Sequence, residues 1–157
     1  MKKKRVVIIS LLLFLVSVIG ISSYFLFKDK INLLDVDHSA VDWNGKKQKD
    51  TSGEENTIAI PGFEKVTLYA NETTQAVNFH NPEINDCYFK ISLIHPDGSV
   101  LWISDLIEPG KGMYSIELEK TLAVGEYENA VLKYECFSLN DQSPLNGSEI
   151  NLKLVVV

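Results

Sequence analysis

Residues 87–104 read CYFKISLIHPDGSVLWIS, and this stretch decides the fold class. Apolar side chains alternate with more polar ones from Cys87 to Leu93, which is the period-two pattern of a strand with one buried face. The pair Asp97-Gly98 then supplies the positive backbone φ that short hairpins require. The stretch therefore predicts two neighbouring antiparallel strands, over Cys87–His95 and Ser99–Ser104.

The same kind of pattern continues on both sides of this hairpin. Short runs rich in Val, Ile, Thr and aromatic residues alternate with turns made of Pro, Gly, Asn and Asp. This spacing predicts an all-β domain over residues 57–157, an antiparallel sandwich, because no segment there keeps a helical period. The other expected strands are Thr57–Ile60, Lys65–Ala70, Gln75–His80, Met113–Leu118, Tyr127–Phe137 and Ser148–Val157.

The N-terminal part of the chain predicts a membrane anchor. Residues 6–27 read VVIISLLLFLVSVIGISSYFLF, 22 residues without a charge. About 20 apolar residues in a helix cross the hydrocarbon core, so this run predicts a single transmembrane helix. Residues 1–5 contain Lys2, Lys3, Lys4 and Arg5, which predicts a cytoplasmic N-terminus and an extracellular C-terminal domain. The alternative is a secretory signal cut near Gly20, which would give a secreted protein.

Residues 28–56 are expected to form an extracellular linker. Charged and small polar residues dominate, and the part from Asn44 to Asn56 has no large apolar residue, so it cannot bury enough surface to offset the entropy of ordering. The first half could instead continue from the span as a short helix. Four possible metal ligands occur here, but they lack the defined register of a cation-binding loop, and we expect no metal site. These residues are Asp35, Asp37, His38 and Asp42.

Charge and motif content exclude several functions. The chain of 157 residues has a net charge of −6, and residues 57–157 alone have 6 Lys against 14 Asp and Glu. This acidic balance argues against a nucleic-acid partner, which needs a concentrated basic surface. The sequence has no Gly-x-Ser-x-Gly elbow, phosphate-binding glycine loop or zinc-type His spacing. We therefore expect no enzymatic activity and no cofactor.

One local pattern is more specific than the strand spacing. Leu122, Gly125 and Tyr127 stand just before an expected strand. In immunoglobulin-like sandwiches, a Tyr at the start of strand F packs across the preceding corner and bonds its hydroxyl to nearby backbone. With Pro109-Gly110, this region resembles immunoglobulin-like or fibronectin-type sandwiches of bacterial surface proteins. It also resembles small membrane-anchored exported proteins of Gram-positive bacteria. The resemblance covers residues 57–157 and implies an architecture without an activity.

The resemblance places the two cysteines on the neighbouring strands C and F. Cys87 opens its strand and Cys136 nearly closes its own, so the two residues are expected at the same end of an antiparallel pair. A disulfide there would close a loop of about 50 residues and contribute about 4 kcal/mol. Export makes oxidation possible. The alternative is two separately buried thiols that act as small apolar side chains.

Surface aromatic residues suggest how the domain could act. Tyr88 lies opposite the expected core face of its strand, and with Trp102 it could form an exposed strip that binds a protein or a sugar. The alternative is that Tyr88 pairs across the sheet and only supports it. We therefore expect an anchored, non-catalytic protein-interaction or accessory module of a cell-envelope assembly, with membrane lipid and an envelope protein as partners. A carbohydrate or cell-wall-binding module is the alternative.

Overall fold

The computed structural model describes residues 33–45 and 57–157. The expected cytoplasmic segment and membrane anchor, residues 1–27, lie outside these described residues. Within the described residues there is no helix with the length and apolar character needed to cross a membrane. Residues 34–157 form one compact unit.

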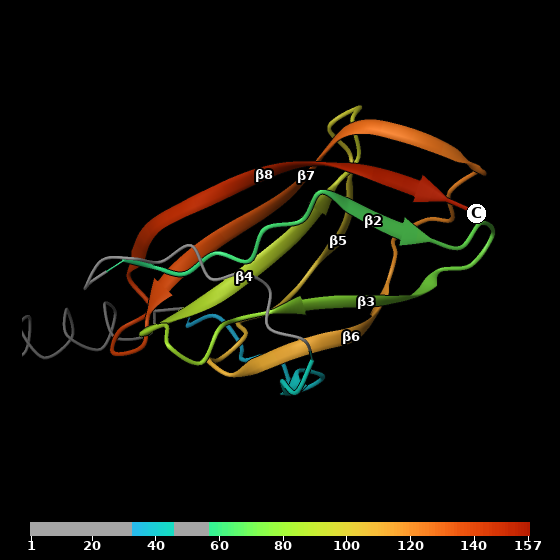
Figure 1. The fold of residues 1–157 in the computed structure, drawn as a ribbon. Helices are drawn as coiled ribbons and strands as arrows, with labels where there is room; N and C mark the ends of the chain where they lie inside the picture. The colour runs from blue at the N-terminus through green and yellow to red at the C-terminus, as the bar shows by residue number, and fades with distance from the viewer. Residues whose placement is uncertain (1–32, 46–56) are drawn as a thin grey trace, which may run out of the picture. The chain divides into compact units, whose positions relative to one another are not determined.

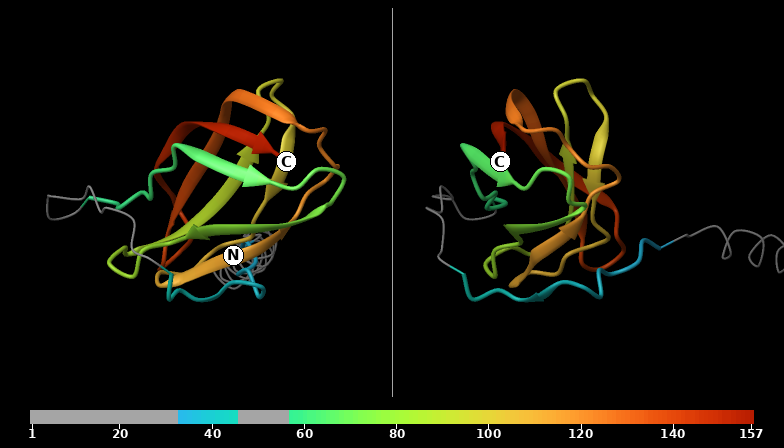
Figure 2. Two further views of the ribbon diagram at one scale, coloured as in Figure 1. Left: turned by 45° about the vertical axis from the view of Figure 1, so that its right-hand side comes forward. Right: turned by 90° about the vertical axis from the view of Figure 1, so that its right-hand side faces the viewer.

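The described residues form two β-sheets that face each other as layers (Figures 1 and 2). The smaller sheet has the order β1-β6-β3, and the larger one has the order β2-β8-β7-β4-β5. The strands are β1 (Val41–Asp42), β2 (Lys65–Leu68), β3 (Thr74–His80), β4 (Cys87–Ile94), β5 (Val100–Ile103), β6 (Lys111–Glu117), β7 (Gly125–Ser138) and β8 (Pro144–Val156). The described part of the chain is thus all-β and resembles a β-sandwich, as the strand pattern predicts. The larger sheet is not the wholly antiparallel one that was expected, because β2 pairs with β8 in parallel from Lys65↔Lys153 to Leu68↔Val156.

The hairpin that decided the fold class forms as expected. β4 pairs with β5, and β4 also pairs with β7 in continuous antiparallel register from Cys87↔Ser138 to Ile94↔Val131. The predicted inward set of β4 is buried, while Tyr88 and Lys90 are only half-buried. The core between the sheets contains Leu68, Phe79, Phe89, Ile91, Leu93, Leu132, Tyr134 and Leu154.

The expected strand Thr57–Ile60 does not form. The backbone of Ala59 is bound by a side chain instead: its N–H donates to Asn85 Oδ1 at 2.7 Å, and its carbonyl accepts from Asn85 Nδ2 at 3.0 Å. Asn85 Nδ2 also donates to Asn81 Oδ1 at 2.8 Å. The amide of Asn85 thus takes the place of a neighbouring strand, so Ala59 is buried without belonging to either sheet.

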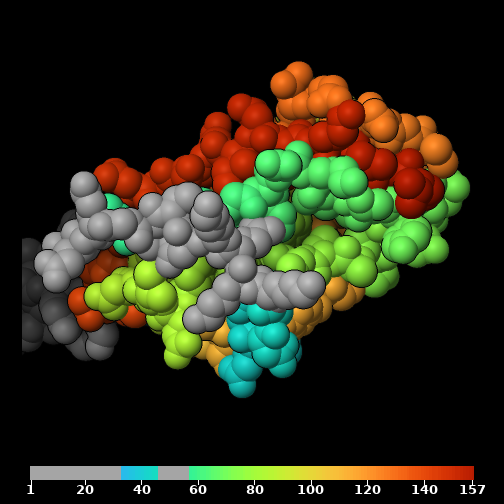
Figure 3. All heavy atoms as spheres, viewed as in Figure 1, coloured from blue at the N-terminus to red at the C-terminus, as the bar shows by residue number. Residues whose placement is uncertain are grey.

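Part of the expected linker belongs to the sandwich. Residues 34–45, here called the strap, run along β6 and the segment after β5. Val36 forms a parallel bridge with Leu106, and Val41 in β1 pairs with Gly112 in β6. Figure 3 shows the strap in cyan at the lower edge of the molecule, where β6 lies. The expectation of a linker over residues 28–56 is therefore wrong for residues 34–45, because the exposed backbone of the sandwich supplies hydrogen-bond partners that a free linker would lack.

Candidate functional site

The expected aromatic strip of Tyr88 and Trp102 is not formed. Trp102 is 7% exposed and stacks on Phe79 in the core, with ring centroids 5.8 Å apart. The pairing of β4 with β5 shifts register between Leu93 and Ile94, as at a β-bulge, so strict alternation fails along β5. Trp102 pairs with the buried Leu93 and therefore faces the core with it, while the extra residue at the shift, Leu101, is buried as well.

The alternative interpretation of Tyr88, that it pairs across the sheet and supports it, fits the structure. It lies directly opposite Phe137 in the β4–β7 pair and is half-buried. Cross-strand aromatic pairs of this kind stabilise a sheet. Tyr88 and Trp102 therefore do not form the expected binding strip on the described surface.

The two cysteines are buried free thiols in the structure, so the expected disulfide is not present. They do lie on neighbouring strands, as expected, but Cys87 pairs with Ser138 and Cys136 pairs with Phe89. This diagonal offset puts the Cα atoms about 7–8 Å apart in a regular sheet, beyond the usual range for a disulfide. The two thiols nevertheless contact each other: the hydrogen bond between them lowers the pKa of Cys87, and the same bond together with burial raises the pKa of Cys136.

The corner before β7 has the expected contacts. The Tyr127 hydroxyl donates to the Ala123 carbonyl at 2.9 Å. Leu122 is 7% exposed and belongs to the core. A Cβ at Gly125 would lie 3.6 Å from the Tyr127 ring, so the ring packs closely over this residue. These residues shape the connection between β6 and β7.

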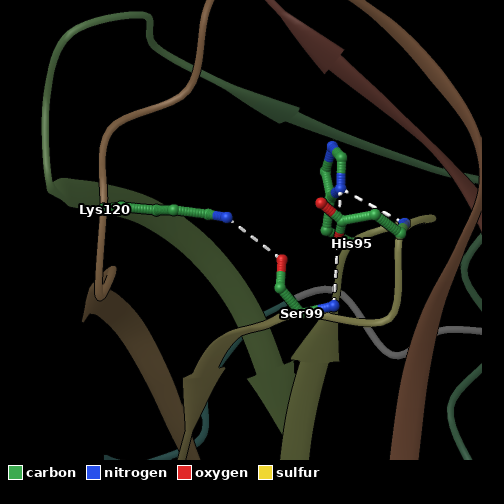
Figure 4. A network of polar contacts seen from close by, with 4 residues as sticks. His95, Ser99 and Lys120 are labelled. Carbon is green, nitrogen blue, oxygen red and sulfur yellow. Dashed lines mark hydrogen bonds and ion pairs between the residues drawn. The ribbon is translucent and has the colours of Figure 1, made fainter.

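Polar residues at the tip of the β4–β5 hairpin form a small network (Figure 4). Asp97 Oδ1 lies 2.9 Å from His95 Nδ1 and accepts the Ser99 N–H at 2.8 Å, while Lys120 Nζ donates to Ser99 Oγ at 3.1 Å. The hydrogen bonds from Ser99, followed by the contact with His95, hold the pKa of Asp97 below its usual range. These contacts close the turn and tie it to the segment after β6.

A candidate site that the sequence analysis missed lies where the strap crosses the smaller sheet. Trp43 from the strap stacks on His80 of β3, with ring centroids 4.0 Å apart and planes 5° from parallel. It also stacks on Tyr114 of β6 at 5.1 Å and 12°. We call these three rings the aromatic stack. Asn44 adds to it, because its Oδ1 accepts from the Tyr114 hydroxyl at 2.7 Å.

Gly112 makes room for the aromatic stack. A Cβ on this residue would lie 2.7 Å from Trp43 Cε3 and 2.9 Å from both His80 Cβ and the Phe79 carbonyl oxygen. Such distances are too short for real contacts, so any side chain here would push the Trp43 ring away. Gly112 was expected just before the strand Met113–Leu118, but the structure places it inside β6, where a glycine marks close approach of another group.

Two nitrogens in the aromatic stack lack hydrogen-bond partners. Trp43 Nε1 and His80 Nδ1 are both buried, and no described residue binds them. A buried polar atom without a partner costs about 1–3 kcal/mol. Desolvation lowers the pKa of His80, which keeps its imidazole neutral near pH 7. The strap therefore docks with an energetic penalty that its release would remove.

The strap covers only the beginning of β6. Trp43 N–H donates to the Gly110 carbonyl at 2.8 Å, and Val41 and Asp42 pair with Gly112 and Lys111. Asp42 also forms an ion pair with Lys111. Beyond Gly112, the described residues add no strand to this side of β6.

The orientation of the uncovered backbone follows from the pairing on the other side. Leu118 N–H donates to the Thr73 carbonyl at 2.8 Å, continuing the register in which Ile116 pairs with Gln75 of β3. Backbone groups of an antiparallel strand alternate between its two neighbours. The N–H and C=O groups of Ser115 and Glu117 therefore point away from β3, toward the uncovered side.

Comparisons with known proteins give no relative for this chain. No protein family model matches it, and neither a curated protein nor a solved structure shows significant similarity.

Proposed function

We propose that this chain is a non-catalytic protein-interaction module, held outside the cytoplasmic membrane by its N-terminal segment and accessory to a cell-envelope assembly. The anchor and orientation rest on the uncharged run 6–27 and the four basic residues before it.

The uncovered edge of β6 is the observation that carries the proposal. An unpaired strand edge presents backbone donors and acceptors in a row and is a common binding surface for extended protein segments. The buried polar side chains, by contrast, bind main chain: Asn81 Nδ2 donates to the carbonyls of Cys87 and Ile107 at 2.8 and 2.9 Å. These groups hold the fold together and leave the edge as the part suited to recognition.

The topology supports an immunoglobulin-like sandwich as the finer description. In that fold, strands B and E share one sheet, and strands C, F and G share the other, with C′ added beside C in variable-type domains. Here β3 and β6 occupy the B and E positions, while β5-β4-β7-β8 follow the order C′-C-F-G. β1 stands beside β6 where strand D would be. The Tyr127 hydroxyl bond adds a second correspondence.

A topology experiment tests the location. Cells producing the full chain with a C-terminal epitope tag are treated with protease before and after permeabilisation, and the membrane fraction is analysed by immunoblot. We expect the tag to stay with the membrane and to be digested in intact cells. Protection of the tag in intact cells would refute the proposal, and N-terminal sequencing distinguishes an uncleaved anchor from a secreted form cut near Gly20.

A crosslinking experiment tests the interaction. Crosslinked membranes should give one recurring envelope protein bound to the tagged chain, and repeated recovery of no protein partner would contradict the proposal. Binding of glycans is not expected, because Trp102 lies in the core. A glycan array with the purified chain checks this point.

A further inference from the structure

The four outer strands of the two sheets differ in how their edges are protected. On β5, the Leu101 carbonyl accepts the Glu119 N–H at 2.9 Å. Beside β2, the backbone N–H and C=O of Tyr69 are both bound by the Gln75 side chain, at 2.7 and 2.8 Å. Hydrogen-bonded covers of this kind stop an edge from pairing with another chain.

The smaller sheet is protected less completely. β3 has one more residue than β6 between the pairs Ala76↔Ser115 and Phe79↔Met113, and such a bulge distorts an edge. On the outer side of β6, the only strand that residues 33–45 and 57–157 supply is β1, two residues long against the seven of β6. Within the described residues, no strand therefore lies beside the N–H and C=O groups of Ser115 and Glu117 on the outer side of β6.

From this comparison we propose that β6 accepts an extended segment of another protein as an added strand, paired along Tyr114–Glu117 and able to replace β1. The proposal rests on the function proposed above and names the surface and the chemistry of its partner. Backbone hydrogen bonds to Ser115 and Glu117 would supply the pairing. Release of β1 would lengthen the available edge to the whole of β6.

The strap is suited to being displaced. Its strand has two residues, and both are exposed. Trp43 Nε1, which is buried without a hydrogen-bond partner among the described residues, opposes its docking, whereas the ring contacts of Trp43 and the bond from its backbone N–H to Gly110 favour it. A competing strand that freed Trp43 would expose that side chain but would also let Trp43 Nε1 bind water.

Charge indicates the chemistry of the partner. Glu117 is exposed on β6, where its carboxylate accepts the Thr74 hydroxyl of β3 at 2.7 Å, and the exposed Glu119 follows it. Residues 57–157 have a balance of −8. A second copy of this chain would bring the same negative charge to the contact, whereas Lys or Arg in an extended segment would complement it. The occupant we infer is therefore a basic, extended segment of a different protein.

A displayed library of random 12-residue peptides tests the proposal with the full chain in lipid nanodiscs. We expect the selected peptides to be enriched in Lys and Arg, and amide hydrogen exchange to slow at Ser115 and Glu117 when they bind. Glu117→Lys should weaken binding about tenfold, since each tenfold change in affinity corresponds to 1.4 kcal/mol. Glu149→Lys on β8 makes the same charge change away from the edge, and binding should stay within about twofold.

Two further variants separate strand addition from simple charge attraction. Ser115→Pro removes a backbone N–H on the open side and should abolish peptide binding, with circular dichroism to confirm the fold. Trp43→Ala should strengthen peptide binding several-fold, because it weakens the competing strap. Equal loss of binding in Glu117→Lys and Glu149→Lys, protection at β2 or β5, or selected peptides without basic residues would each overturn the proposal.

The other possible occupants give distinct results. Sedimentation that shows a dimer broken by Ser115→Pro would make a second copy the occupant and overturn the proposal. Slow exchange at Ser115 and Glu117 without any peptide, lost when residues 46–56 are replaced by a Gly-Ser sequence, would assign the edge to this chain's own segment. Peptide binding at β6 combined with a protease-protected C-terminal tag would leave the edge site standing while the proposed location fails.

Discussion

Replacing Asn85 with Ala tests the side-chain clamp that takes the place of an expected strand. Asn85 is 7% exposed and makes three hydrogen bonds of 2.7–3.0 Å to Ala59 and Asn81. Ala59 and Asn81 are 3% and 0% exposed, so water cannot easily replace the lost partner. Asn85→Ala therefore leaves two backbone groups and one amide oxygen unsatisfied.

The expected effect is large for one side chain. Each unsatisfied buried group costs about 1–3 kcal/mol, and partial relaxation of residues 57–60 reduces the sum to about 2–4 kcal/mol. For a domain of this size, that loss in the free energy of unfolding lowers Tm by about 8–16 °C. Urea unfolding of the detergent-solubilised full chain, followed by the fluorescence of buried Trp102, measures it.

Asn140→Ala is the matched control for this prediction. Asn140 is exposed, and its side chain makes no hydrogen bond among the described residues, so its loss should change the free energy of unfolding by less than about 0.5 kcal/mol. If Asn85→Ala unfolds at the same urea concentration as the wild-type chain, the clamp does not stabilise Ala59 and the reasoning is refuted.

Three other perturbations follow from the site and the corner. Gly112→Ala should destabilise the domain by about 1–3 kcal/mol and shift Trp43 fluorescence to the red, because the new Cβ overlaps the Trp43 ring; unchanged fluorescence would contradict the packing. Tyr127→Phe should cost about 0.5–1.5 kcal/mol in thermal unfolding through loss of the bond to Ala123, and a neutral result would argue against the corner. Burial lowers the pKa of His80, so the unfolded chain binds its proton more readily. Stability from this group should be complete above about pH 6.5 and decline as pH falls toward 5, and His80→Phe should remove that decline in urea titrations at several pH values.

The alternation of apolar and polar residues predicted most of the strands, because a strand of a sandwich must bury one face and leave the other more exposed. Alternation over Cys87–Leu93 and the Asp97-Gly98 turn depend only on neighbours in the sequence, and both predictions are confirmed by β4 and its pairing with β5. The corner at Tyr127 was predictable for the same reason, since its hydroxyl bonds to a carbonyl four residues earlier.

The candidate site was not predictable from local pattern. Trp43 meets Tyr114 and His80 across long sequence separations, and only the register of β3 with β6 brings Gly112 beneath its ring. Two pairing residues are too few to distinguish a strand from a linker by sequence pattern, so residues 34–45 were expected to belong to the linker or to a short helix.

Periodicity and turn chemistry by themselves determined that residues 57–157 are built from strands and which side chains of β4 enter the core. The tertiary structure decided which edges are covered, which aromatic residues are buried and whether the two cysteines form a disulfide. Those outcomes depend on register, and a bulge or an offset of two residues changes them while leaving the local sequence pattern intact.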